Sequence, residues 1–132
     1  MQHSQLLPLT KHDTAKAEQL VALGYPQVAS LLPALLEWMQ DLNWPVSQKL
    51  QPLLAGIGAP LAPHVRTILA TNDETWKYSV LVGLVARSAE LARQLEPDLV
   101  RLASQPTDAE RQESLDQEAR EILKSKGAGF KI

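Results

Sequence analysis

The sequence predicts an all-α fold in which about seven antiparallel helices follow one another as a short solenoid. Apolar residues recur at intervals of three and four along most of the 132 residues, which is the period of helices with one buried face. Prolines and glycines interrupt this pattern where helices should begin and end. No stretch shows the strict alternation of apolar and polar residues that is typical of a strand.

The chain opens with an arm over residues 1–12, which leads into the first predicted helix. Asp13 or Thr14 can cap this helix, because a side-chain oxygen accepts hydrogen bonds from the free amides of the first turn. Gly24 should end it, since glycine adopts the left-handed cap conformation without steric cost.

Prolines shape the next two predicted helices. Pro26 and Pro45 suit first-turn positions, where their missing N–H groups do no harm. Pro33 lies inside the second helix and should bend or split it. Pro52 lies inside the third helix, and we expect a kink or a break near it.

Four more helices are expected in the second half. Thr71 and Thr107 are each followed three residues later by glutamate, which is the spacing of a capping box. The helix over residues 76–87 is apolar nearly all round, so it should be buried. Residues 125–132 are expected to form a flexible tail. The core should include Leu54, Ile57, Leu81 and Val85.

Two motifs recur about one repeat apart. Gly24-x-Pro26 recurs as Gly58-x-Pro60 after 34 residues, and Trp44 recurs as Trp76 after 32 residues. Periods in this range are typical of helical solenoids, in which each helix pair buries its apolar stripe against the next pair. The pattern therefore favours a HEAT-like α–α superhelix, and an irregular helical bundle is the alternative.

The composition limits the class of protein. With 45% hydrophobic residues the chain can bury a real core, and we expect a single helical-repeat domain over residues 1–132. The formal net charge of −2 argues against general nucleic-acid binding. The chain has no cysteine, no run of about 18 apolar residues and no signal peptide at its start. We therefore expect a cytoplasmic protein that does not span a membrane.

No pattern of residues indicates catalysis or metal binding. His3, His12 and His64 are scattered rather than spaced as metal ligands. His12 and Asp13 are neighbours in the chain, and adjacent residues rarely orient each other as a catalytic dyad. We expect no catalytic residue, no cofactor and no metal.

Two aromatic segments supply the candidate partner-binding surface. Trp44-Pro45 and Trp76-Lys77-Tyr78 each stand where the second helix of a pair should begin, and such places align along one edge of a solenoid. The two indoles should then be neighbours about 10 Å apart, with at least one partly exposed. The alternative is that they only fill gaps between helices. The predicted surface consists of Asp41, Trp44, Pro45, Lys49, Asp73, Trp76, Lys77 and Tyr78.

These same segments carry a resemblance to a known family. The stretches KHDTAKAEQLVALGYP, LLPALLEWMQDLNWPV and DETWKYSVL resemble a family of small bacterial proteins catalogued as a domain of unknown function. The resemblance spans residues 6 to about 124 and includes the motifs D-x-N-W-P and W-K-Y. It implies a HEAT-like helical fold and no established activity or cofactor. Ser79 departs from the pattern, because a second aromatic residue is expected after Tyr78.

We therefore expect a non-catalytic protein–protein interaction module whose partner is another protein. Its small acidic format suits an immunity protein that blocks a toxin. One alternative is a helical-repeat enzyme, such as a nucleic-acid glycosylase or a lyase, and another is a structural scaffold subunit. A glycosylase needs a basic face, whereas residues 1–89 hold six acidic and six basic side chains.

Overall fold

A computed structural model describes residues 6–125 of the chain. Within this range the chain is all-α, as the sequence predicts, with nine α-helices, short 3-10 turns and no strand. The helices are α1 (Thr14–Leu23), α2 (Leu32–Glu37), α3 (Pro45–Ile57), α4 (Ala62–Leu69), α5 (Glu74–Gly83), α6 (Ala89–Gln94), α7 (Glu96–Ser104), α8 (Asp108–Gln112) and α9 (Leu115–Ser125). The 3-10 turns are η2 (Ala29–Leu31), η3 (Trp38–Gln40), η4 (Ala59–Leu61) and η5 (Val85–Arg87).

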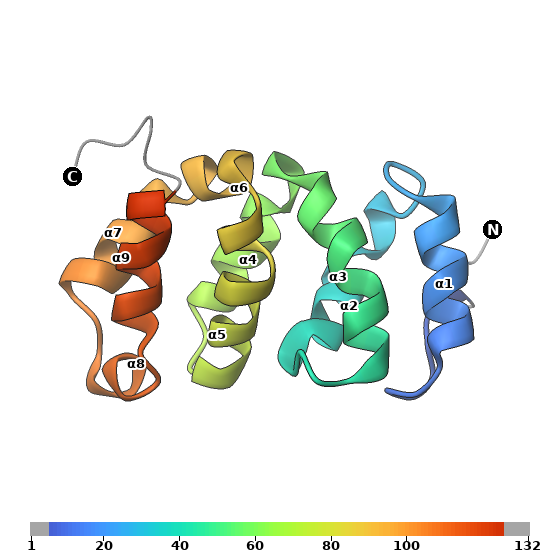
Figure 1. Cartoon of the computed structure of the whole chain (residues 1–132), viewed down its shortest axis with the longest axis horizontal. Helices are drawn as coiled ribbons and strands as arrows, with labels where there is room; N and C mark the ends of the chain where they lie inside the picture. Colours follow the sequence, from blue (N-terminus) through green and yellow to red (C-terminus); the bar gives the residue numbers. More distant parts are fainter. Residues whose placement is uncertain (1–5, 126–132) are drawn as a thin grey trace.

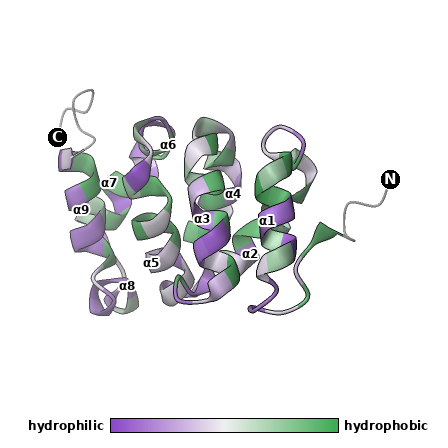
Figure 2. Ribbon diagram, turned by 45° about the vertical axis from the view of Figure 1, so that its right-hand side comes forward, coloured by the Kyte–Doolittle hydropathy of each residue, from purple (hydrophilic) through white to green (hydrophobic). Residues whose placement is uncertain are grey.

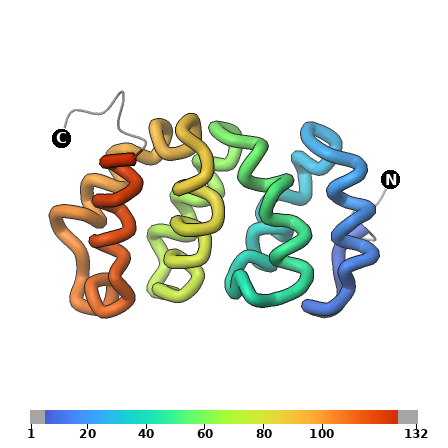
Figure 3. The backbone as a smooth tube through the Cα atoms, viewed as in Figure 1, coloured from blue at the N-terminus to red at the C-terminus, as the bar shows by residue number. Residues whose placement is uncertain are grey.

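The helices stand side by side in a row, with α1 at one end and α7 and α9 at the other (Figure 1). Along this row α1 packs on α3, and α7 packs on α9. The colour order of the trace in Figure 3 shows that α2 and α4 run in one direction and α3 and α5 in the opposite direction. Helix α5 packs on η3 as well as on α9, so it connects the two halves of the row.

The repeated Gly-x-Pro motif marks the same backbone feature twice. Gly24 and Gly58 follow α1 and α3 directly, with φ angles of 71° and 76°. Residues with a Cβ atom rarely adopt a positive φ, which explains why glycine stands at both places. The sequence repeat of 34 residues therefore corresponds to a repeated helix ending.

The prolines act in two different ways. Pro33 splits the predicted second helix, because it lies in the first turn of α2 and follows the separate 3-10 turn η2. Pro52 does not break its helix, since α3 runs from Pro45 to Ile57 without interruption. Of the kink or break expected near Pro52, the break is therefore absent, and the kink stays a prediction.

The C-terminal third contains more helices than the sequence predicts. Helix α6 is additional, and it is followed directly by α7, which has Pro97 in its first turn. The last expected helix is divided into α8 and α9 at Ser114, which has a positive φ of 60°. The tail predicted over residues 125–132 lies outside the described residues, except for Ser125 at the end of α9.

Only one of the two predicted capping boxes is formed. Thr107 accepts a hydrogen bond from the backbone N–H of Glu110, whose carboxylate in turn accepts from the N–H of Thr107. The capping box predicted at Thr71 is wrong, because Asp73 is the residue that caps α5 and accepts from the N–H of Trp76 (3.0 Å). A cap must directly precede the first helical residue, and Thr71 lies two positions too early.

One apolar core runs along the whole row of helices. Figure 2 shows apolar and polar residues alternating around the helices, as expected where each helix buries one face. Leu54, Leu81 and Val85 are completely buried, as predicted, whereas Ile57 is only partly buried.

Replacing Leu81 with alanine should lower the free energy of unfolding by about 2–5 kcal/mol, because it leaves a cavity at a completely buried position. Denaturant unfolding followed by circular dichroism measures this loss. Leu9→Ala is the matched control, since Leu9 is 80% exposed and should lose much less. Equal losses in the two variants would contradict the assignment of α5 to the core.

Candidate functional site

Trp38 and Trp44 form an aromatic pair at the turn between α2 and α3. The Asp41 carboxylate accepts a hydrogen bond from the N–H of Asn43 (2.8 Å), and the N–H of Trp44 donates to the carbonyl of Asp41 (3.1 Å). These bonds close a tight turn, so Trp44 comes back beside Trp38. The ring centroids lie 5.9 Å apart, with 71° between the ring planes.

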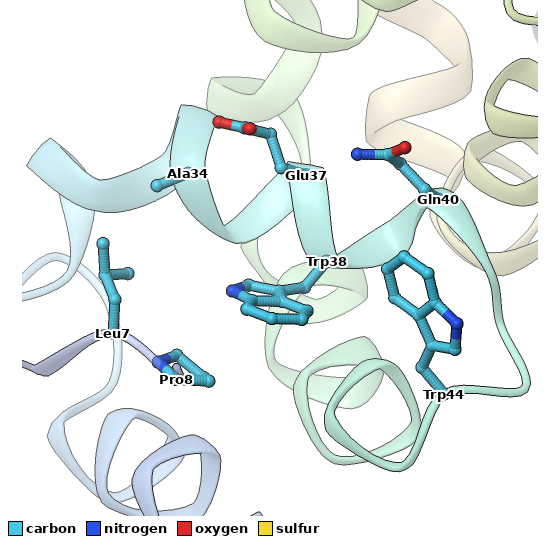
Figure 4. A pocket seen from close by; sticks show the side chains of 7 residues that line it. All are labelled: Leu7, Pro8, Ala34, Glu37, Trp38, Gln40 and Trp44. Carbon is cyan, nitrogen blue, oxygen red and sulfur yellow. The ribbon is translucent and has the colours of Figure 1, made fainter. Parts of the chain in front are cut away.

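This pair lines a pocket of about 320 Å³, which we call the indole pocket. In Figure 4, Trp38 lies across its middle, with Trp44 to one side, Leu7 and Pro8 to the other, and Glu37 and Gln40 above. The indole pocket is lined by Leu7, Pro8, Ala34, Glu37, Trp38, Gln40 and Trp44.

A second hollow of about 410 Å³, the Trp76 hollow, lies between α2, α4 and α5. The indole N–H of Trp76 donates to the backbone carbonyl of Leu36 (3.0 Å), which fixes the ring against α2. The hollow is lined by Pro33, Leu36, Glu37, Gln40, His64, Thr67, Ile68 and Trp76.

Glu37 and Gln40 line both hollows, so they form a crest between them. Trp44 therefore lies in the indole pocket and Trp76 in the hollow across the crest, with the third tryptophan, Trp38, beside Trp44. All three tryptophans are half-buried, so none is sealed inside the core. We call the surface formed by the two hollows and the crest the tryptophan surface.

The side chains of the three residues in the W-K-Y motif point in different directions. Successive residues of an α-helix are about 100° apart around its axis. Trp76 faces α2, whereas the side chain of Lys77 is only 4% exposed and lies inside the protein. Tyr78 lines another hollow with residues of the α8–α9 region. The structure therefore places Lys77 and Tyr78 apart from the tryptophan surface.

Lys77 belongs to a buried ionic network centred on Glu110, which is 1% exposed. The Lys77 ammonium donates to Oε2 of Glu110 (2.9 Å) and lies 3.6 Å from the carboxylate of Glu74. Arg101 donates from Nη1 to Oε1 (2.7 Å) and from Nη2 to Oε2 (2.9 Å) of the same carboxylate. These contacts join α5, α7 and α8.

The network lowers the pKa of Glu110 to about 2. The largest cause is the hydrogen bond from Arg101, and the contacts with Thr107 and Lys77 add to it, whereas burial alone would raise the pKa. The ammonium of Lys77 is thus paired with a carboxylate inside the protein, where it joins α5 to α8.

The remaining predicted site residues have local structural contacts. Asp41 and Asp73 shape the turns before α3 and α5, and Pro45 is the first residue of α3. Lys49 lies 3.6 Å from Glu18 of α1, and both side chains are at least half exposed, so this pair contributes little to stability.

The sequence pattern did not predict Trp38, Glu37 and Gln40, which complete the tryptophan surface. A helical spacing could have indicated Glu37 and Gln40, because Pro33, Glu37 and Gln40 recur at intervals of four and three. The pattern did not predict Glu110 either, since nothing in the local sequence shows that a capping glutamate also binds Lys77, 33 residues earlier.

The hollow beside Tyr78 contains a carboxyl group with a shifted pKa. Burial, helped by the charge of Glu121, raises the pKa of Glu118. This hollow is lined by Tyr78 of α5 and by residues of the α8–α9 region, and it shares no lining residue with the tryptophan surface. Helices α8 and α9 stand at the C-terminal end of the row (Figure 1). In the described part of the chain, no three His, Asp or Glu side chains are grouped as metal ligands.

In the part of the chain that the structure describes, the fold and its hollows define an all-helical protein whose three tryptophans line two hollows on either side of a crest. The chain matches the family described as a domain of unknown function, DUF5071, over residues 6–123. It therefore belongs to the DUF5071 family. No curated protein matches the chain. Among the described residues, no helix is long and apolar enough to cross a membrane.

Ser79, the departure from the expected motif, has a contact of its own. It is 5% exposed, and its hydroxyl donates to the backbone carbonyl of Gln40 (3.2 Å). The serine thus helps to hold α5 against η3.

The Glu110 network should make the free energy of unfolding depend on pH in the acidic range. The folded pKa of about 2 lies below the ordinary 4.5, so the stabilisation is complete above about pH 4.5 and lost as the pH falls toward 2. The stabilisation lost over this pH range is on the order of 3 kcal/mol. Denaturant unfolding between pH 7 and pH 2 measures it, and a Glu110→Gln variant should lack this part of the pH dependence. An identical pH profile in that variant would contradict the role of Glu110.

Proposed function

We propose that this chain is a non-catalytic protein-interaction module, built as a short HEAT-like solenoid, that binds another protein through the tryptophan surface. A partner that the chain neutralises, as an immunity protein neutralises a toxin, would suit its small acidic format. The shape of the fold, the character of the surface and the position of the titratable groups support this proposal.

Three side-chain hydrogen bonds join residues about one repeat apart in the sequence, and this pattern supports the solenoid. Gln51 donates to the carbonyl of Gly83, and Arg66 donates to the carboxylate of Asp98, each across 32 residues. Lys77 reaches Glu110 across 33 residues. In a solenoid each unit contacts its neighbour at equivalent positions, so side-chain bonds are expected at this constant separation.

The observation that carries the proposal is the gathering of three half-buried tryptophans around the Glu37–Gln40 crest. Tryptophan is among the residues that contribute most to binding at protein interfaces, where its large ring becomes fully covered. The alternative role, in which the indoles only fill gaps, accounts better for Trp76, whose N–H is already bonded to Leu36. Trp38 and Trp44 have no such bond to the described residues.

A catalytic function would start from carboxyl groups with shifted pKa values. The Glu110 carboxylate accepts four hydrogen bonds, from Lys77, from two nitrogens of Arg101 and from the N–H of Thr107, so it has no free lone pair for a substrate. The pKa of Glu118 is raised mainly by burial, and this residue lines a hollow separate from the tryptophan surface. These positions favour binding over catalysis at the tryptophan surface.

Site-specific photo-crosslinking tests where a partner docks. A photoreactive amino acid replaces Gln40 on the crest in one variant and Tyr78 in another, and crosslinked proteins from the source cells are identified by mass spectrometry. The proposal predicts one specific protein crosslinked from position 40, and its loss when Trp44 is also changed to alanine. Circular dichroism checks that each variant is folded.

Crosslinks of equal strength from both positions, or from position 78 alone, would contradict the tryptophan surface as the docking site. Position 78 is the matched comparison, because Tyr78 is exposed to 37% yet lines a separate hollow.

A further inference from the structure

We propose that the indole pocket binds a cationic side chain, arginine or lysine, of the partner protein. This inference rests on the proposed function, because it assigns the chemistry that the tryptophan surface recognises. Three features of the pocket support it, namely its two ring faces, its carboxylate and its apolar wall.

The two rings form a corner that suits a cation. The planes of Trp38 and Trp44 meet at 71° in an edge-to-face contact, so the two rings form the two sides of a corner. An ammonium or guanidinium group over an indole face is attracted by the negative charge of the ring quadrupole, and tryptophan gives the strongest such attraction. Two indoles at this angle resemble the walls of aromatic cages that recognise cations.

Glu37 gives the pocket its charge preference. Its side chain is exposed and lines the pocket rim, as Figure 4 shows. Within residues 6–125 its carboxylate forms no salt bridge, unlike Glu18, Glu74 and Glu110. A free carboxylate at the rim of this pocket attracts a cation and repels an anion, which makes the site selective.

The pocket also has the right size and an apolar wall. A volume of about 320 Å³ is at the lower end of the range for ligand pockets, so it accommodates one side chain rather than a large cofactor. Leu7, Pro8 and Ala34 offer apolar surface on which the methylene stem of lysine or arginine can pack while its charged end reaches the rings.

The Trp76 hollow lacks this combination. It has one indole instead of two, and the N–H of that indole is already bonded to the carbonyl of Leu36. Trp76 therefore serves as an internal control, because a cation that enters the indole pocket should perturb Trp38 and Trp44 and leave Trp76 unaffected.

Nuclear magnetic resonance of the three indole N–H groups tests the inference directly. The full chain, labelled with ¹⁵N, is titrated with N-acetyl-arginine methylamide and, in parallel, with its neutral analogue N-acetyl-citrulline methylamide. We expect the arginine compound to shift the Trp38 and Trp44 signals in a saturable manner, with much weaker shifts from citrulline. The three signals are assigned from single Trp→Phe variants.

Variants then separate charge from aromatic contact. Glu37→Gln should weaken arginine binding about two- to fivefold, the range that corresponds to loss of one exposed charge contact. Glu121→Gln, which removes an exposed carboxylate of α9, is the matched control and should bind as the parent chain does. Trp44→Leu should abolish the saturable shift of Trp38.

Equal shifts with arginine and citrulline, shifts of Trp76 alone, or no saturable shift would overturn the cation site. Failure here is distinguishable from failure of the proposed function. If a partner crosslinks at position 40 while arginine and citrulline behave alike, the docking site stands and only its cation preference is wrong. If arginine binds selectively while no partner crosslinks at position 40, the pocket stands and the interaction module is contradicted.

Discussion

The attachment of α5 to the α2–η3 segment is the constraint on which the tryptophan surface depends. Two side chains of α5 make it, since Trp76 donates to the carbonyl of Leu36 and Ser79 to the carbonyl of Gln40. These bonds lie near the end of α2, where backbone carbonyls have few helical partners of their own. Because α5 is fixed there, the crest of Glu37 and Gln40 stands between two hollows instead of being covered.

The buried network around Glu110 supports this arrangement from the opposite side of α5. Lys77 immediately follows Trp76, so any displacement of α5 would also pull the Lys77 ammonium from its carboxylate. Separating a buried charge pair leaves an uncompensated charge, and breaking such a pair typically costs about 3–5 kcal/mol. The W-K-Y motif thus holds α5 to α2 with one residue and to α7 and α8 with the next.

The sequence was sufficient to predict the helical fold, the two glycine helix endings and the core positions of Leu54 and Leu81, because these follow from local periodicity and backbone conformation. The site was only partly predictable. Trp44 and Trp76 were identified from their repeat spacing, but the side-chain directions of Lys77 and Tyr78 depend on which face of α5 meets which neighbour. Trp38 was missed because its contact with Trp44 depends on the turn at Asp41 rather than on the repeat.

Hydrogen exchange of the complex with the crosslinked partner tests most directly the claim that the tryptophan surface is the docking site. Exchange of backbone amides, read by mass spectrometry, is compared for the free chain and for the complex. The account predicts slower exchange over residues 32–44, which carry the crest and the indole pair, and unchanged exchange over residues 108–125 of α8 and α9. Slower exchange confined to residues 108–125 would contradict it.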